Sequence, residues 1–248
     1  MRNRRGLFAG MQSGRLSGFV PYKGTKDLPN AGRISRFIRN FVDMKVALCQ
    51  FSMEWEAAAR NLRRAEELVA QAGADLALLP EMFATGFVTE PWRTALPDEE
   101  ELLAWMRRTA RRYATALAGS AVVRSGDRFA NRFFFVRPAG GAERYDKRHL
   151  FSIGGEDAHF VEGRRRVVVE YGGLRFLPLV CYDLRFPVWC RCRSDYDAIL
   201  CVASWPAPRR EVWRTLLRAR AIENQCYVVG VNRTGDDLSL IHISEPTR

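Results

Sequence analysis

Short apolar runs alternate with segments of helical periodicity over residues 44–232, and this alternation limits the folds that the chain can adopt. Residues 54–72 place apolar side chains at helical spacing, and Gly73 follows as a helix stop. Glycine-containing turns at residues 125–127 and 172–173 join neighbouring apolar runs, which predicts β-hairpins. The helices exclude an all-β fold, and the hairpins exclude a pure array of parallel strands. The pattern therefore predicts an α/β fold in which helices pack outside two sheets.

The periodicity also predicts bounds for each element. We expect strands at residues 46–51, 76–79, 121–124, 129–136, 143–146, 167–171, 174–180, 198–204 and 227–232. We expect helices at residues 54–72, 98–118 and 210–224, and Asp98 is the expected amino-terminal cap of the second helix.

Positive charge is concentrated before the first clear strand. Residues 1–43 hold nine Lys or Arg and two acids, which accounts for +7 of the net charge of +11. Three interpretations are open for this leader: a disordered basic segment, an organellar presequence, or upstream sequence translated from an early start. Met44 begins the first strand and favours the last of these. We expect a domain at residues 44–237 and a tail at residues 238–248 that does not continue its pattern.

Composition and spacing disfavour several classes of function. The arginine runs at residues 107–112 and 164–166 lack interleaved aromatic residues, so no nucleic-acid partner is expected. No window holds the roughly eighteen apolar residues of a membrane span, so no membrane partner is expected. Cys190 and Cys192 have no second pair or nearby histidine to complete a metal site, and no cofactor is expected. The cysteines show no disulfide framework, which favours reduced thiols and a cytoplasmic location.

Three reactive side chains stand where predicted strands end. Cys181 directly follows the apolar residues 176–180, Glu81 follows the second strand, and Lys147 follows a shorter one. Strand ends in α/β folds expose reactive side chains and free backbone N–H groups. Each residue alone has a plainer explanation, namely a buried structural thiol, a surface acid and a surface lysine.

Together the three residues meet the requirements of thiol chemistry. A free thiol is only a few per cent ionised at pH 7, so a nucleophilic cysteine needs a base or a positive neighbour. Glu81 should be poorly solvated beside Phe87, which suits a general base, and Lys147 supplies the positive charge. A Cys–His dyad is less favoured because none of the three histidines is well placed: His149, His159 and His242. A serine triad is weaker still, since no G-x-S-x-G elbow exists.

Several blocks of the chain match a known pattern. LLPEMFATGF, YDKRHLF and LVCYDLRFPVW resemble the three signature blocks of the nitrilase, or carbon–nitrogen hydrolase, superfamily. GGEDAHF, ASWPAPR and RAIENQCYVVGVNR resemble its ω-amidase branch most closely, and the resemblance covers residues 44–237. It implies a four-layer α-β-β-α sandwich, usually paired into homodimers, with a Glu–Lys–Cys triad.

The resemblance also implies roles for individual residues. Glu81 would take the proton of Cys181, and the thiolate would attack the amide carbon to give a thioester and ammonia. Lys147 and the backbone N–H of Tyr182 would hold the developing oxyanion. Glu156 matches the second glutamate of the family, which holds the lysine in place.

Substrate choice is expected to depend on residues around the thiol. The Tyr-Asp pair after Cys181 resembles amidase members rather than nitrilases, and ω-amidases act on 2-oxo-dicarboxylate monoamides such as 2-oxoglutaramate and 2-oxosuccinamate. Arg185 is the candidate for binding the substrate carboxylate, although an ion pair with Asp183 or Glu223 would explain it equally well. Two aromatic residues are expected either to wall the pocket or to pack in the core: Phe87 and Trp205.

The end of the chain departs from the family pattern. The family continues past the equivalent of Asn232 with a Gly-rich segment, a Ser-containing strand and a closing hairpin, whereas LSLIHISEPTR stands here. We expect a truncated or misassembled copy that lacks its last strands and leaves a sheet edge open. A homodimer with a small-molecule amide substrate is expected if this end is intact. An amidase for another small amide or carbamoyl compound, and an inactive family member, are the alternatives.

Overall fold

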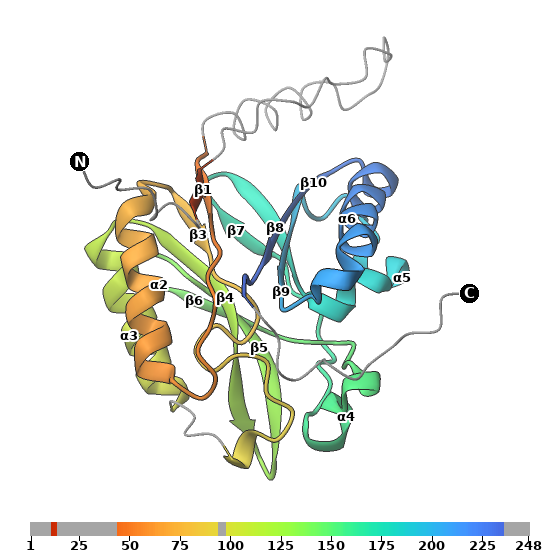
Figure 1. The fold of residues 1–248 in the computed structure, drawn as a ribbon. Coiled ribbons are helices and arrows are strands. Elements are labelled where there is room, and N and C mark those ends of the chain that lie inside the picture. The colour runs from red at the N-terminus through yellow and green to blue at the C-terminus, as the bar shows by residue number, and fades with distance from the viewer. Residues whose placement is uncertain (1–10, 14–43, 94–97, 236–248) are drawn as a thin grey trace, which may run out of the picture.

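Two β-sheets pack face to face and helices cover their outer sides (Figure 1). The computed structural model describes residues 11–13, 44–93 and 98–235. Within these residues one sheet has the strand order β1-β2-β3-β4-β5-β6, and the other has the order β10-β9-β8-β7. The predicted α-β-β-α arrangement is confirmed.

The first sheet contains β1 (Met11–Ser13), β2 (Val46–Cys49), β3 (Leu76–Leu78), β4 (Ala116–Ser125), β5 (Arg128–Val136) and β6 (Ala142–Asp146). The second contains β7 (Val169–Tyr171), β8 (Leu174–Val180), β9 (Ala198–Ala203) and β10 (Tyr227–Asn232). The α-helices are α2 (Ala58–Ala72), α3 (Glu99–Arg112), α4 (Glu156–His159), α5 (Pro187–Cys190) and α6 (Arg210–Asn224). Short 3₁₀ helices are η1 (Pro91–Arg93), η2 (Ser152–Gly154), η3 (Cys181–Arg185) and η4 (Ala207–Arg209).

Alternate residues of each strand belong to different layers of the core. In β3, Leu76 and Leu78 pack between the two sheets, whereas Ala77 packs under α2 and α3. Between the sheets the rings of Phe135 and Phe176 stack with centroids 6.3 Å apart. α6 covers the outer face of the second sheet (Figure 1). This layering is what the alternation of strand and helix patterns in the sequence predicts.

Two predicted chain reversals and one predicted helix stop are present. Gly73 caps α2 with φ +53°, in the left-handed region that glycine adopts without steric cost. β4 and β5 form an antiparallel hairpin, and so do β7 and β8. Most predicted bounds agree with the structure to within a few residues, although β4 begins five residues before the predicted 121.

The second helix ends earlier than predicted. The Asp98 carboxylate accepts the Glu100 N–H at 3.1 Å, as expected of a helix cap. The predicted end at residue 118 is wrong, because α3 stops at Arg112 and Ala114 has φ +51°. Residues 116–118 instead pair in parallel with β3. Their sequence, Ala-Leu-Ala, suits a helix or a buried strand, and only pairing with β3 distinguishes the two.

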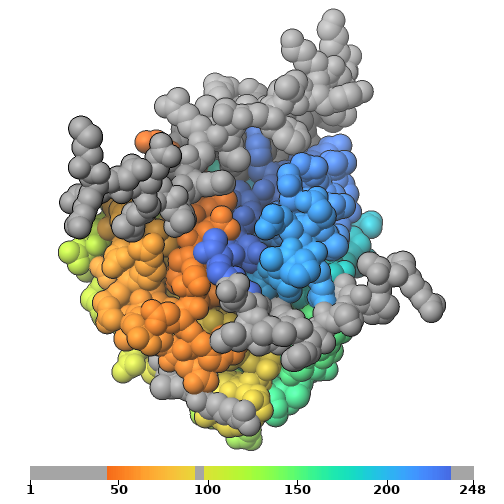
Figure 2. Space-filling model, in the orientation of Figure 1, coloured from red at the N-terminus to blue at the C-terminus, as the bar shows by residue number. Residues whose placement is uncertain are grey.

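The predicted leader and tail lie almost wholly outside the described residues. Residues 11–13 form β1, antiparallel to β2, and the remainder of 1–43 and all of 238–248 are not described. The bounds 44–237 and the missing last strands therefore stay predictions. After β10, the Thr234 N–H donates to the Phe51 carbonyl at 3.1 Å, so the blue and orange segments adjoin in Figure 2. In the described part of the chain no helix is long and apolar enough to cross a bilayer.

Three buried cysteines contribute free thiols to the core. Cys49 is 2% exposed, and Cys190 and Cys201 are fully enclosed. Burial raises the pKa of Cys49 and of Cys190 to about 12, and it raises the pKa of Cys201 well above the ordinary value. The folded state therefore keeps these protons at a pH where the unfolded chain has released them.

Alkaline conditions should destabilise the fold for this reason. Above about pH 9 the unfolded state binds fewer protons than the folded state, so the free energy of unfolding falls by up to about 1.4 kcal/mol per pH unit for each thiol. We expect the urea midpoint under reducing conditions to fall steadily as the pH rises from about 9 toward 12. A Cys49→Ala, Cys190→Ala double variant should show a shallower decline, and an unchanged slope would contradict the explanation.

Candidate active site

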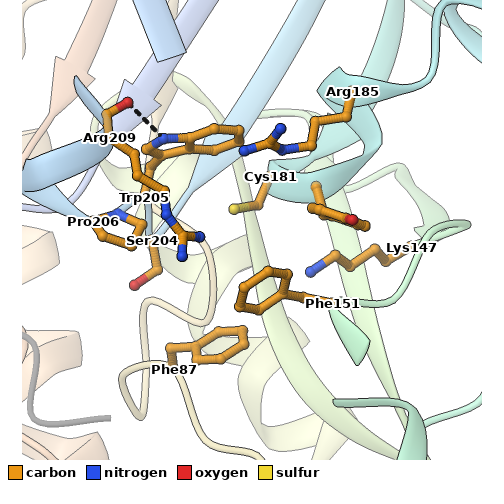
Figure 3. A pocket seen from close by; sticks show the side chains of 10 residues that line it. Phe87, Lys147, Phe151, Cys181, Arg185, Ser204, Trp205, Pro206 and Arg209 are labelled. Carbon is orange, nitrogen blue, oxygen red and sulfur yellow. Dashed lines mark hydrogen bonds between the residues drawn. The ribbon is translucent and has the colours of Figure 1, made fainter. Parts of the chain in front are cut away.

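The structure brings Glu81, Lys147 and Cys181 to one edge of the two sheets. β3 and β4 are parallel, and β4, β5 and β6 are successive antiparallel neighbours, so β3 and β6 end at the same edge. Glu81 follows β3 and Lys147 follows β6. Cys181 directly follows β8 of the facing sheet, and its side chain lines the same pocket as Lys147 (Figure 3).

Lys147 is buried between two carboxylates. Its Nζ lies 2.9 Å from Glu81 Oε1 and 2.8 Å from Glu156 Oε2, and all three side chains are 0% exposed. Burial by itself lowers the pKa of Lys147, but the attraction of Glu156, Glu81 and Cys181 outweighs that effect and raises it. The ammonium therefore stays charged at neutral pH.

Neutral donors complete the binding of the two carboxylates. Asn131 Nδ2 lies 2.9 Å from Glu81 Oε1 and 3.0 Å from Glu156 Oε1. The Ser204 N–H donates to Glu81 Oε2 at 2.9 Å, and the Phe151 N–H donates to Glu156 Oε2 at 2.7 Å. The two carboxylates and the ammonium thus share the interior with hydrogen-bond donors from one amide and two backbone N–H groups. Buried charges are tolerated only when they are paired and hydrogen-bonded in this way.

Asn131 is a site residue that the sequence analysis missed. It lies on the same face of β5 as Phe129, Phe133 and Phe135, and it is fully buried. A polar amide at a core-facing position of an aromatic strand is the signal that could have identified it. Its Oδ1 has no hydrogen-bond partner within the described residues. Its Nδ2 is committed to the two carboxylates.

Cys181 lies at the tip of a tight turn directly after β8. Its φ is +46°, which is rare for a residue with a side chain, and η3 begins at the same position. The thiol is partly exposed to the pocket and lies close enough to Glu81 for the carboxylate to affect its pKa. Burial and the charge of Glu81 raise the pKa of Cys181, and the charge of Lys147 opposes this only in part. The resting thiol is therefore protonated at neutral pH.

Asp183 joins the turn at Cys181 to the segment around Lys147. Its Oδ2 accepts the Val180 N–H at 3.0 Å and the Tyr145 hydroxyl at 2.8 Å. Its Oδ1 accepts the His149 N–H at 2.9 Å and lies 2.8 Å from His149 Nδ1. Asp183 is fully buried. Its partners Tyr145 and His149 lie two positions before and two positions after Lys147 in the chain.

Glu223, the other acid considered as a partner for Arg185, forms an ion pair with Arg220 at 2.9 Å. Arg185 itself lines the pocket. Its guanidinium carbon lies 5.3 Å from the centroid of the Trp205 ring and 5.8 Å from that of Tyr182. These contacts fit cation–π packing on the pocket wall.

The pocket combines aromatic walls with positive charge (Figure 3). Phe87, Tyr182 and Trp205 line it, together with residues that the sequence pattern did not single out: Phe151, Ser204, Pro206 and Arg209. Phe87 and Trp205 are each only 5% exposed, so they also belong to the core. No Asp or Glu is among the residues that line this pocket in the described part of the chain.

A second arginine approaches the pocket from the opposite wall. Arg209 lies with its guanidinium carbon 5.9 Å from the Phe151 ring centroid, and its carbonyl accepts the Trp205 Nε1–H at 3.0 Å. Figure 3 shows the guanidinium groups of Arg185 and Arg209 on different sides of Cys181. The cavity therefore suits a small anionic molecule whose reacting group lies close to the thiol.

A family model described as carbon-nitrogen hydrolase matches residues 45–244. The chain belongs to this family and is a hydrolase of carbon–nitrogen bonds other than peptide bonds. Among its relatives, the omega-amidase YafV of Yersinia enterocolitica is 49% identical over 78% of this chain and 76% of that protein. YafV of Escherichia coli strain K12 is 44% identical over 83% and 80%, and the 2-oxoglutaramate amidase of Bacillus subtilis is 32% identical over 77% of both. The resemblance to the ω-amidase branch is confirmed.

Solved structures of the same family share the fold. The CN-hydrolase superfamily protein XC1258 of Xanthomonas campestris, which carries an arsenic adduct in its active site, has a TM-score of 0.75 and 41% identity over 79% of this chain and 77% of that one. A mutant of the amidase from Nesterenkonia sp. AN1 has a TM-score of 0.71 and 26% identity over 77% and 79%. In that structure acrylamide has added to the active-site cysteine.

Removing the central ammonium should destabilise the protein. Lys147→Met leaves two buried carboxylates without their counter-charge, so we expect the free energy of unfolding to fall by about 3–5 kcal/mol. Lys45→Met makes the same chemical change at an exposed residue and should have little effect. Urea unfolding of both variants measures the difference, and equal effects would show that the buried ion pairs do not stabilise the fold.

Proposed function

We propose that the protein is an ω-amidase that hydrolyses 2-oxo-dicarboxylate monoamides, such as 2-oxoglutaramate and 2-oxosuccinamate, to the 2-oxo acid and ammonia. The observation that carries this proposal is the partly exposed thiol of Cys181 beside the buried Glu81–Lys147 pair, on the wall of a pocket that holds two arginines. The names of the relatives from Yersinia, Escherichia and Bacillus support the substrate class.

In this proposal Glu81 acts as the general base for Cys181. Because the pKa of the thiol is raised, the resting cysteine is neutral and needs a base at the moment of attack. The carboxylate lies close enough to the thiol to raise its pKa, and in this proposal it receives the proton. The sulfur then bonds to the amide carbon, and the pair of electrons from the carbonyl moves onto its oxygen.

Lys147 and the backbone N–H of Tyr182 hold the oxyanion in this mechanism, since both adjoin the thiol. The carbon–nitrogen bond breaks as nitrogen takes a proton from Glu81, and ammonia leaves while a thioester remains on Cys181. Glu81 next takes a proton from water, whose oxygen attacks the thioester. The carbon–sulfur bond then breaks, the acid leaves, and Glu81 returns the proton to the Cys181 thiolate. Glu156 keeps Lys147 charged and in position through its 2.8 Å ion pair. These steps use water together with side chains and backbone of this chain, and we propose that no cofactor takes part.

Arg185 binds the substrate carboxylate in this proposal, and Arg209 adds positive charge from the facing wall. A guanidinium can contact a carboxylate through two parallel N–H groups, which orients the substrate as well as attracting it. Phe87 and Trp205 enclose the carbon chain between the carboxylate and the amide. The absence of Asp or Glu among the described lining residues disfavours substrates that carry an ammonium group.

The proposal extends to the state of the protein in the cell. The six cysteines, all of which lie in the described residues, are free thiols, which fits a reducing compartment such as the cytoplasm. A homodimer is proposed from the family resemblance.

Ammonia release from 2-oxoglutaramate tests the reaction directly. We expect activity in the wild type and a loss of more than about 10³-fold in Cys181→Ala, because the nucleophile is removed. Cys192→Ala, which changes a partly buried thiol that does not line the pocket, is the matched control and should keep its activity. Mass spectrometry of the acid-quenched enzyme should find the acyl adduct on Cys181. Activity only on other amides or carbamoyl compounds in the same assay would favour the alternative substrates.

A second experiment tests the carboxylate site. Arg185→Met should reduce kcat/KM for 2-oxoglutaramate by about 10- to 100-fold through the loss of charge-assisted hydrogen bonds. Hydrolysis of propionamide, which carries no carboxylate, should change little. Arg191→Met at an exposed position is the control. An equal loss on both amides would show that Arg185 supports the fold of the pocket instead of recognising the substrate.

A further inference from the structure

One neutral residue contacts both carboxylates of the buried cluster and the backbone of Lys147. The two hydrogens of Asn131 Nδ2 are directed to Glu81 Oε1 at 2.9 Å and to Glu156 Oε1 at 3.0 Å. The backbone carbonyl of Asn131 accepts the Lys147 N–H, also at 2.9 Å. Asn131 thus fixes the backbone that carries the ammonium and the side chains of both acids.

These contacts make the two oxygens of Glu81 unequal. Oε1 accepts hydrogen bonds from Asn131 Nδ2 and Lys147 Nζ, whereas Oε2 accepts the backbone N–H of Ser204. Each donor withdraws electron density from the oxygen that it contacts and makes that oxygen a weaker proton acceptor. Oε2 is therefore the more basic of the two.

The amide of Asn131 is held in one orientation. The reversed amide would direct its oxygen at two carboxylates, which repel it, so Nδ2 must face them. Its Oδ1 stays without a partner in the described residues. The side chain is therefore arranged for its two donor contacts.

We propose that Asn131 is a positioning residue that, together with Lys147, occupies Oε1 of Glu81 and so directs the proton of Cys181 to Oε2. This inference rests on the proposed function, because it assigns the base of that reaction at the level of single atoms. By bridging Glu81 and Glu156, Asn131 also holds both acids in place around one ammonium. The ionisable groups that face Glu81 are Lys147 after β6, Glu156 of α4, Cys181 of η3 and Cys201 of β9.

Asn131→Leu tests the proposal, since leucine has a similar size and no donors. We expect kcat for 2-oxoglutaramate to fall by about 10- to 100-fold, as is usual when a group that orients a reacting residue is lost, with little change in KM. The pH–rate profile should also differ from that of the wild type, because Oε1 of Glu81 loses one of its two donors. Asn61→Leu is the control for loss of a buried amide: Asn61 is 2% exposed in α2 and bonds to the Ala84 carbonyl at 2.8 Å. It should lose stability without moving the profile.

A second variant covers the case in which the first does not fold, and a second readout reports on the thiol independently of amide turnover. If Asn131→Leu does not fold, Asn131→Asp can be used in its place, because a protonated aspartic acid supplies one donor. The Asn131→Asp enzyme should lose its activity at neutral pH and partly regain it on acidification. The rate at which acrylamide alkylates Cys181, followed by mass spectrometry across pH, reports on the thiol without amide turnover. We expect Asn131→Leu to change that pH dependence and Asn61→Leu to leave it unchanged.

The outcomes separate the two proposals. Wild-type protein that releases no ammonia from any amide would defeat the proposed function, whereas the alkylation profiles would still decide the role of Asn131. Wild-type pH dependence of both turnover and alkylation in the Asn131 variants would overturn the positioning role and leave a structural residue.

Discussion

The site depends on burying one positive and two negative charges together in the interior. Taking an ion out of water costs several kcal/mol even after the protein relaxes, so none of these groups is tolerable alone. Lys147 lies within 2.9 Å of both Glu81 and Glu156, and each charge offsets the burial of the others. The acids outnumber the ammonium, and the amide of Asn131 together with two backbone N–H groups supplies the remaining donors.

The same cluster determines the state of the thiol. Burial and the negative charge of Glu81 raise the pKa of Cys181, while Lys147 compensates only in part. A thiol held neutral beside a carboxylate is a poor nucleophile until a proton moves between them. In the proposed mechanism this transfer accompanies attack on the substrate, when the ammonium of Lys147 is needed by the new oxyanion.

These groups meet only if the two sheets are held at a fixed separation and orientation. The acids and the ammonium are anchored in or beside the first sheet, and the thiol ends a strand of the second. The inter-sheet core, where Phe135 stacks on Phe176, sets the separation of the layers. Asp183 then ties the turn at Cys181 to the segment that carries Lys147, through Tyr145 and His149. The geometry therefore depends on packing across the whole sandwich.

By itself the sequence determined the layers, the hairpins, the stop at Gly73 and the strand ends where Glu81, Lys147 and Cys181 stand, because periodicity and turn chemistry act over a few neighbouring residues. It did not reveal the end of α3, where an Ala-Leu-Ala run became strand through pairing with β3. Asn131 looked like an ordinary strand residue, and Arg209 like one of many surface arginines. Only the tertiary structure decided these cases, since the partners of each are distant in the chain and a side chain's role depends on what burial places beside it.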